Sequence, residues 1–490
     1  MSRLTLDEAT VQVSGLRQEI LIKSLEDQNR AVNGDFVAIE ILPKTQWLKN
    51  YKSMGPAIDV IDSEQEPEEK PDSDDEDAKR ETPLMQQINE SKLKVTARVV
   101  GVVKKFPKTY GGSILNLDQM VKKTQDKLKA FAAENKLSDA EIGKFYRVFV
   151  PYNNQLPQIL VKTNAPDALA NKRLIVRISK WPVTSPFPYG QFVKIIGQEG
   201  KIRTETDMIL HEYNVDTRPF SQKVIACLPP EGKEWRASPQ EMAKRLDLRH
   251  LDVCSVDPIG CKDIDDALHC ITLPNGNYEV GVHIADVSHF VKAGAEIDKE
   301  AARRCTTVYM VDRRTDMLPG LLTETLCSLI SDVDRMAFSV IWEIDSKTFT
   351  AVKTRFAKTC IRSRASLNYY KAQEMIDDKN DKTPLTMSLR GLLTIARVLR
   401  DRRIQNGALT LASPELKFKL DNESQNPTDV SEYLHVDTHF MIEEFMLLAN
   451  VAVAERLAQY YPSFAILRRH PLPKQDQLQD LVDQLAKRGF

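Results

Sequence analysis

Alternating apolar and polar positions divide the first part of the chain into short runs separated by turn residues. Two such runs, Ala9–Val13 and Phe36–Leu42, lie on either side of Asn33-Gly34-Asp35. Period-two alternation bounded by turn residues is typical of antiparallel strands. The stretch is short for a closed barrel, so we expect residues 1–50 to form part of a small β-domain.

The same alternation returns after residue 93. The runs are Lys94–Lys104, Phe145–Pro151, Arg173–Lys180 and Gln191–Ile196. This spacing predicts a small five-stranded barrel of the OB or cold-shock type over residues 93–215.

From about residue 240 the pattern changes to a mixture of strands and longer helices. Ser388–Asn406 has apolar residues at helical spacing and is followed by Gly407, and Asp437–Tyr461 ends before Pro462. The mixture predicts a larger α/β or α+β domain over residues 216–490.

Charge is distributed unevenly along the chain. The 490 residues include 68 Lys and Arg against 69 Asp and Glu, a formal net charge of −1. Residues 64–81 contain ten acidic and three basic residues, a net −7, so the remainder carries +6. Without aromatic or β-branched residues, this segment predicts a flexible linker within residues 51–92; an acidic recognition segment is the alternative. The net-positive remainder is compatible with a nucleic-acid partner.

Basic and aromatic residues are interleaved along the predicted barrel. They are Lys104, Lys105, Arg147, Arg177, Lys180 and Lys194, beside Phe106, Tyr110, Tyr146 and Trp181. Bases stack on rings while cations follow the phosphates, so this combination suits single-stranded nucleic acid. The alternative is that the rings simply fill the barrel core.

Several functional classes are excluded or disfavoured. The seven cysteines form no CxxC pair, which argues against a disulfide framework or zinc knuckle. No run approaches the roughly 18 apolar residues of a membrane span, so we expect no membrane partner. GxxxxGK[ST], HExxH and GxSxG motifs are absent, which disfavours ATP hydrolysis, zinc proteolysis and serine hydrolysis.

Four carboxylates crowd one stretch of the third region: Asp257, Asp263, Asp265 and Asp266. A solvated turn is one interpretation, because Pro258 and Gly260 favour a bend. Ile264 and its apolar neighbours instead favour entry into a core, where such carboxylates would require a cation. Oxygen-only ligands select Mg²⁺ or Mn²⁺.

A hairpin follows this stretch, with Asn275-Gly276 as a two-residue turn signal. That turn would set Asp265 opposite Asp286 and Leu268 opposite His283. Opposed like charges destabilise a sheet unless something bridges them. A metal ion would bridge them, and a bulge that breaks the register is the alternative.

These residues carry a resemblance to the RNase II/RNase R (RNB) family of processive 3′-to-5′ exoribonucleases, and within it to the catalytic subunit of the eukaryotic RNA exosome. The matching stretches are DPIGCKDIDDALHC, GNYEVGVHIADVSHFV, TTVYMVDRRTDMLP, LCSLISDVDRMAFSVIWEID and EEFMLLANVAVAERL, with NRAVNGDFVAIEILPKTQW and RVVGVVKKF resembling parts of the family's cold-shock domains. The resemblance implies cold-shock (OB) barrels, the first of them partial, followed by an α+β RNB catalytic domain.

The resemblance also implies roles for individual residues. The family's metal-binding aspartates match Asp257, Asp263, Asp265 and Asp266, and Asp265 and Asp266 are the implied catalytic residues. Its RNA-contacting residues match Tyr309, Tyr369 and either Glu443 or Glu444. Ordinary core rings and an exposed helix face are the alternatives for these last positions.

The implied activity is Mg²⁺-dependent hydrolysis of single-stranded RNA that releases nucleoside 5′-monophosphates, with Mn²⁺ as a second candidate ion. The implied partners are the core exosome subunits, and the implied location is the nucleus, including the nucleolus, and the cytoplasm. The setting would be RNA processing and decay, including rRNA processing.

The chain departs from the family pattern in two respects. The family's arginine-bearing SPIRRYADxxVHR-like segment and S1 domain do not occur before Phe490. We therefore expect an RNB domain truncated at its C-terminal end. The competing hypothesis is a catalytically incomplete RNA-binding or scaffold fragment of the exosome.

Overall fold

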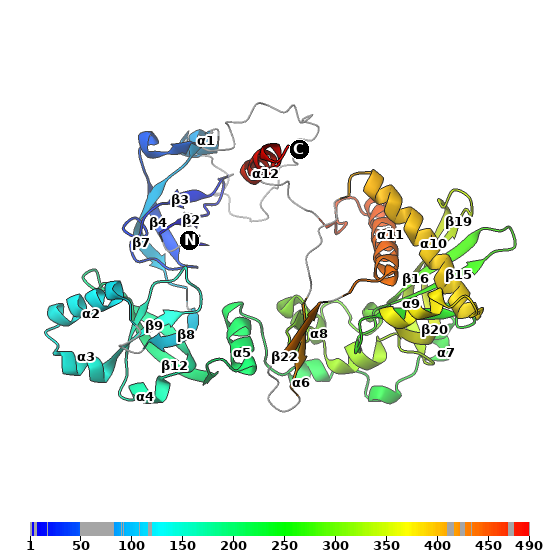
Figure 1. Cartoon of the computed structure of the whole chain (residues 1–490), viewed down its shortest axis with the longest axis horizontal. Helices are drawn as coiled ribbons and strands as arrows, with labels where there is room; N and C mark the ends of the chain where they lie inside the picture. The colour runs from blue at the N-terminus through cyan, green and yellow to red at the C-terminus, as the bar shows by residue number, and fades with distance from the viewer. Residues whose placement is uncertain are drawn as a thin grey trace. The chain divides into compact units, whose positions relative to one another are not determined.

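The computed structural model divides the chain into two compact units. One comprises Met1–Asn214 with His470–Phe490, and the other comprises Val215–Arg469 (Figure 1). The structure describes residues 2–3, 7–16, 18–49, 83–89, 91, 93–106, 108–115, 120–408, 416–421, 427–432, 434–468 and 475–489. The acidic segment 64–81 lies outside these residues.

The N-terminal region is built from short antiparallel strands. They are β1 (Ser2–Arg3), β2 (Ala9–Val11), β3 (Ile20–Ile22), β4 (Phe36–Ile41), β5 (Leu48–Lys49), β6 (Leu93–Lys94) and β7 (Ala97–Lys104), with the 3₁₀ turn η1 (Lys44–Gln46) and helix α1 (Pro83–Asn89). β1, β2 and β3 form one sheet, β4 pairs with β7, and β5 pairs with β6.

This pairing corrects two predicted boundaries. The run at 94–104 does not open the second barrel, because β7 pairs with β4 and Val99 is buried with Ile20 and Ile22 in the N-terminal core. Part of the predicted linker, residues 83–89, is helix α1, whose Ile88 is buried in that core. Alternation identifies a strand but not its partner.

The second barrel is closed and has five strands, which confirms the predicted OB-type fold. Its strands are β8 (Thr109–Leu115), β9 (Tyr146–Pro151), β10 (Ile159–Lys162), β11 (Lys172–Lys180) and β12 (Tyr189–Gln198), in the order β10-β12-β11-β8-β9. The accompanying helices are α2 (Lys122–Glu134), α3 (Asp139–Phe145), α4 (Pro166–Leu169) and α5 (Ile202–Glu212). Gly112 permits close pairing of β8 with β9, because a Cβ there would lie 2.1 Å from the Val150 carbonyl oxygen.

The aromatic residues predicted to belong to the barrel lie in different surroundings. Tyr110 is 2% exposed and belongs to the barrel core, as the packing alternative predicted. Phe106 is 48% exposed, but it lies before β8 and its N–H donates to Asp35 of the N-terminal region, so it is not a barrel residue. Arg177 and Lys194 are exposed on β11 and β12. The exposed cations remain suitable for a phosphate backbone.

The second unit is centred on a six-stranded mixed sheet. Its order is β13 (Leu246–Asp247), β20 (Ala351–Asn368), β14 (Val253–Asp257), β15 (Asp266–Thr272), β16 (Tyr278–Ala285) and β19 (Asp334–Ile344). β20 also pairs with β19, because its 18 residues are long enough for residues 351–362 to pair with β19 and residues 363–368 to pair with β14. The arrangement confirms the α+β class.

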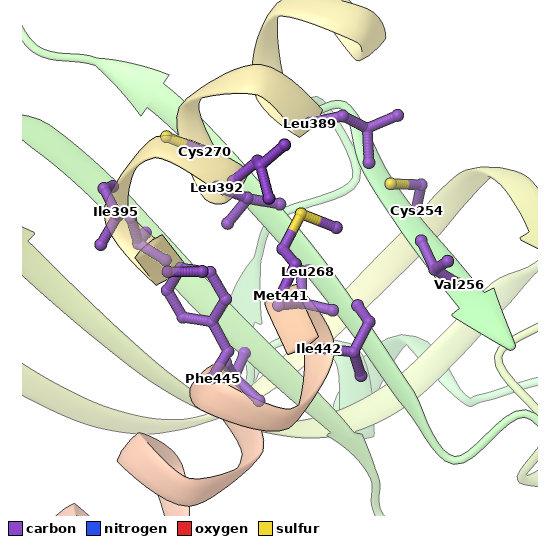
Figure 2. Close-up of a cluster of buried hydrophobic side chains, with 14 of the residues drawn as sticks. Cys254, Val256, Leu268, Cys270, Leu389, Leu392, Ile395, Met441, Ile442 and Phe445 are labelled. Carbon is purple, nitrogen blue, oxygen red and sulfur yellow. The ribbon is translucent and has the colours of Figure 1, made fainter. Parts of the chain in front are cut away.

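Three helices cover one face of this sheet: α9 (Tyr369–Asp377), α10 (Pro384–Gln405) and α11 (Asp437–Tyr460). The last two confirm the helices predicted from the apolar spacing and the turn residues that follow. Figure 2 shows their side chains packed on β14 and β15, with Leu392 and Phe445 essentially fully buried. This packing fixes the strand ends that carry the aspartates.

The remaining elements of this unit are short. They are α6 (Gln222–Ile225), η5 (Gly232–Glu234), α7 (Pro239–Met242), η6 (Val287–His289), α8 (Glu296–Arg304), β17 (Val308–Tyr309), β18 (Arg314–Thr315), the π-helix η7 (Leu321–Leu326), β21 (Leu416–Leu420) and β22 (Pro427–Glu432). Helix α12 (Gln475–Lys487) groups with the first unit. None of the helices described in the structure is long and apolar enough to cross a membrane.

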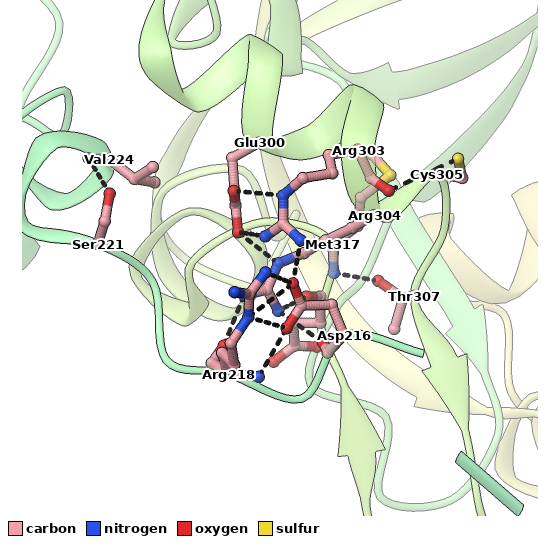
Figure 3. A network of polar contacts seen from close by, with 11 residues as sticks. Asp216, Arg218, Ser221, Val224, Glu300, Arg303, Arg304, Cys305, Thr307 and Met317 are labelled. Carbon is pink, nitrogen blue, oxygen red and sulfur yellow. Dashed lines mark hydrogen bonds and ion pairs between the residues drawn. The ribbon is translucent and has the colours of Figure 1, made fainter. Parts of the chain in front are cut away.

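A network of arginines and carboxylates attaches the start of the second unit to α8 (Figure 3). Asp216 accepts hydrogen bonds from Arg218 and Arg303, and Arg303 also pairs with Glu300 at 2.5 Å. Arg304 lies over the Phe220 ring at 4.1 Å. These contacts hold residues 216–220 against the helix.

A buried polar chain crosses the sheet. The rings of His269 and His283 share a hydrogen bond of 2.8 Å, His283 Nδ1 lies 2.7 Å from Ser339 Oγ, and that oxygen lies 2.7 Å from Thr359 Oγ1. Burial and the neighbouring His269 hold the pKa of His283 well below its usual value. His283 is therefore neutral in the folded protein.

We expect His283 to make stability depend on pH below 6.5. Since the folded pKa is depressed, its stabilisation is complete above the unfolded pKa near 6.5 and is lost as pH falls below it. One such group contributes up to about 1.4 kcal/mol between pH 7.5 and 5.5. Urea midpoints at the two pH values should therefore differ more for wild type than for His283→Gln. Equal differences would contradict the depressed pKa.

Candidate active site

The four predicted aspartates lie at and between the ends of two neighbouring strands. Asp257 is the last residue of β14 and Asp266 the first of β15, and Asp263 and Asp265 lie in the connecting loop. β14 and β15 pair antiparallel, so the end of one meets the start of the other. Gly260, at φ +84°, supplies the left-handed conformation in the loop. The structure thus places the four aspartates in one strand–loop–strand segment.

The carboxylates of this loop repel one another in a partly dehydrated setting. Burial, with the charges of Asp257 and Asp265, raises the pKa of Asp266 to about 7. Burial also raises the pKa of Asp257 to about 6, with Asp265 and Asp263 adding to the shift. The pKa of Asp265 is likewise raised, chiefly by burial and then by Asp263. Ionising all of these carboxyl groups therefore costs free energy that the cations of the protein do not fully offset.

The hairpin after the loop corrects the predicted register. Asp266 is opposite Ile284, and Leu268 is opposite Val282, one position from the prediction. The turn contains three residues, because Leu273 pairs with Asn277 and Gly276 adopts φ +82°. A three-residue hairpin loop with a left-handed glycine is a common alternative to the two-residue turn.

Asp286 consequently does not oppose Asp265. The Asp265 carbonyl accepts a hydrogen bond from the backbone N–H of Ala285 instead. Asp286 is buried and binds Arg245 at 2.7 Å and Lys358 at 3.2 Å. Two side-chain cations, not a metal bridge to Asp265, balance this carboxylate.

Hairpin β17–β18 contacts the loop through Asp263. The Tyr309 hydroxyl donates to Asp263 Oδ2 at 2.8 Å, and Arg314 Nη1 donates to Oδ1 at 2.7 Å. Burial and the bond to Asp263 raise the pKa of Tyr309 to about 12. The Tyr309 side chain is otherwise exposed, so its ring is available to a ligand near the aspartates. Sequence reasoning identified Tyr309 but missed Arg314, although both lie in TTVYMVDRRTDMLP.

Tyr369 lies beside the same strand end. It begins α9, directly after Asn368, which pairs with Asp257 across β20 and β14. Its ring stacks on His439 with centroids 3.9 Å apart, and its carbonyl accepts from Thr438. The ring of Tyr369 is thus partly buried against the core, as the packing alternative for this position predicted.

Glu443 and Glu444 have different surroundings on α11. Glu444 is 4% exposed and binds Arg403 at 2.6 Å, whereas the Glu443 side chain is 48% exposed and lies 3.1 Å from the same guanidinium. The buried ion pair between Glu444 and Arg403 therefore links α11 to α10. Glu443 is the member of the pair that a ligand can reach.

The aspartates fit a divalent cation in donor chemistry. Asp257 Oδ2 is buried without a hydrogen-bond partner, and carboxylate oxygens are the donors preferred by Mg²⁺ and Mn²⁺. As they stand, the described residues include no group of three or more Asp, Glu, His or Cys side chains converging on one point. Of the four predicted ligands, Asp257, Asp265 and Asp266 are the residues that would hold a cation, whereas both oxygens of Asp263 accept hydrogen bonds from Tyr309 and Arg314.

Comparison with known families agrees with this architecture. An RNB domain model matches residues 245–490, a Dis3-like cold-shock domain 2 model matches 146–214, and an Rrp44-like cold shock domain model matches 1–110. The RNB match covers half of the chain and contains the aspartate loop. The chain therefore belongs to the RNB-domain family.

The chain is also similar in sequence to individual curated proteins. It is 44% identical to the mouse exosome complex exonuclease RRP44 over 476 residues, which is 96% of this chain and 46% of that protein. The chain thus spans about half the length of the curated relatives that it matches.

Solved structures share the fold. RNase R of Mycoplasma genitalium, in complex with ribose-methylated single-stranded RNA, matches 96% of this chain and 63% of that one, with TM-score 0.69 and 20% identity. Yeast Ssd1, described as a pseudonuclease, matches 99% of this chain and 57% of that one, with TM-score 0.65 and 20% identity. Because a nuclease and a pseudonuclease share this fold, activity must be argued from the site.

Proposed function

We propose that the protein is a Mg²⁺-dependent exoribonuclease that hydrolyses single-stranded RNA from the 3′ end and releases nucleoside 5′-monophosphates. The observation that carries the proposal is the aspartate loop, where uncompensated carboxylates lie next to an exposed aromatic ring. The relative at 44% identity is named an exonuclease of the exosome complex, which supports the same reaction class.

The residues of this chain have distinct tasks in such a reaction. Asp257, Asp265 and Asp266 hold the charge that a divalent cation requires. The chemistry supplied by a bound cation is activation of water and stabilisation of the oxygen that leaves the phosphodiester. The exposed ring of Tyr309 offers a stacking surface for the terminal base, which orients the last phosphodiester toward the aspartates.

Tyr369 and Glu443 complete the proposed RNA contacts. Tyr369 is fixed by its stack on His439 beside the Asp257 strand end. Glu443, the more exposed of the two glutamates, is the one we assign to the ribose of the 3′ end. A carboxylate accepts hydrogen bonds from the 2′ and 3′ hydroxyls of a terminal ribose. A DNA end has no 2′ hydroxyl and can donate only one of these bonds.

We further propose single-stranded RNA and the core exosome subunits as partners, in the nucleus and cytoplasm. RNase R, which shares the fold, is described in complex with single-stranded RNA, and RRP44 is described as part of the exosome complex. The exposed cations of the second barrel would bind the phosphates of a single-stranded RNA.

A cleavage assay tests the proposal. The protein is incubated with 5′-labelled single-stranded RNA and Mg²⁺, and products are separated by length. We expect a ladder that shortens from the 3′ end and is abolished by EDTA, because the carboxylates alone cannot activate water. RNA that is bound but keeps its length would contradict the enzyme assignment and favour an RNA-binding scaffold.

A further inference from the structure

Asp263 differs from the other three aspartates because the protein already occupies both of its oxygens. Tyr309 binds Oδ2 and Arg314 binds Oδ1, and these two residues lie directly opposite each other in hairpin β17–β18. Asp257 Oδ2, by contrast, has no hydrogen-bond partner. One carboxylate of the loop is thus engaged by the hairpin while its neighbours keep oxygen atoms for a ligand.

Arg314 is itself held in a fixed orientation. Its guanidinium binds Asp263 at 2.7 Å, Asp316 at 2.5 Å and Glu324 at 2.6 Å, and its side chain is 19% exposed. These three acceptors lie in the aspartate loop, just after β18 and in the π-helix η7. A planar guanidinium presents several donors in fixed directions, whereas a lysine ammonium on a flexible stem does not.

We infer that Arg314 is a positioning residue of the site, which ties the Tyr309 hairpin to the aspartate loop through Asp263 and limits the loop's affinity for a divalent cation. This inference rests on the proposed function. Asp263 is then an anchor, and direct cation binding falls to Asp257, Asp265 and Asp266.

The positive charge of Arg314 is expected to weaken the binding of a divalent cation to the aspartate loop. A guanidinium bound to Asp263 stands next to the place where a dication would bind, and like charges repel. For charges of +1 and +2 about 6 Å apart under water-like screening, the repulsion changes an affinity about tenfold. Removing the charge should therefore tighten cation binding, whereas loss of a structural support would weaken it.

Mn²⁺ binding to the protein, followed by the EPR signal of the free ion, separates these outcomes. We expect Arg314→Gln and Arg314→Met to bind Mn²⁺ about tenfold more tightly than wild type. Arg314→Lys keeps the charge and should stay within about twofold of wild type. The matched control is Arg303→Gln, which removes an arginine paired with Asp216 and Glu300 in the network of Figure 3.

Each result decides the inference. Affinity that is unchanged or weaker in Arg314→Gln would overturn it, and so would loss of the near-UV CD spectrum in both neutral variants, which would make Arg314 a structural residue. Failure of wild type to bind Mn²⁺ at all would instead overturn the proposed function. The two failures are therefore distinguishable.

Discussion

Asp266→Asn is expected to slow phosphodiester hydrolysis at least about a thousandfold, which corresponds to about 4 kcal/mol of transition-state stabilisation. The substitution keeps the shape of the side chain but removes one of the charges that would hold a cation. Asp266 begins β15, and its burial, together with the charges of Asp257 and Asp265, raises its pKa to about 7. No lysine or arginine is among the groups that shift this pKa.

RNA affinity should stay within about twofold of wild type in the same variant, because the exposed barrel cations and Tyr309 are untouched. Single-turnover cleavage and fluorescence anisotropy measure the two quantities on one RNA. Asp401→Asn, an exposed carboxylate on α10, is the matched control and should cleave at the wild-type rate. Equal rates for wild type and Asp266→Asn would remove the aspartate loop from catalysis.

Arg245→Met is expected to lower the free energy of unfolding by about 3–5 kcal/mol. The side chains of Arg245 and Asp286 are 1% and 3% exposed and bind each other at 2.7 Å. Removing one member of a buried pair leaves the other charge without adequate solvation. Here the half-exposed Lys358 and the Ser288 hydroxyl would remain beside Asp286, and neither replaces the buried guanidinium.

Urea unfolding followed by tryptophan fluorescence measures this loss. The double variant Arg245→Met/Asp286→Leu is the control, and we expect it to recover most of the stability because no buried charge is left alone. It should also bind Mn²⁺ as wild type does, since Asp286 is not assigned to the cation. A double variant as unstable as the single one would show that the pair itself is not the source of the loss.

The position of the aspartates could be predicted from the sequence, but the register of their hairpin could not. Asn275-Gly276 is the strongest short hairpin signal, yet Pro274 joins the loop and Gly276 takes the left-handed position. One extra loop residue shifts every pair by one, which moves Asp286 away from Asp265. The length of the loop determines the register, and the residue preferences of Asn275 and Gly276 do not reveal that length.

Contacts between residues far apart in the chain could not be predicted from the sequence either. The strand at Ala97–Lys104 alternates as clearly as any barrel strand, but its partner β4 lies across a long insertion in the chain. Arg314 was missed for a similar reason, because its acceptors Asp263 and Glu324 lie 51 and 10 residues away. Helices α10 and α11, whose apolar spacing and ends are local, were predictable.

The central claim is that this protein hydrolyses RNA from the 3′ end at the aspartate loop. The most direct measurement is the cleavage assay run in ¹⁸O-labelled water with Mg²⁺, with the released mononucleotides analysed by mass spectrometry. Hydrolysis predicts nucleoside 5′-monophosphates with one ¹⁸O atom in each new phosphate, formed by wild type and not by Asp266→Asn. Release of no mononucleotide, or of unlabelled nucleotides that require added inorganic phosphate, would contradict the account.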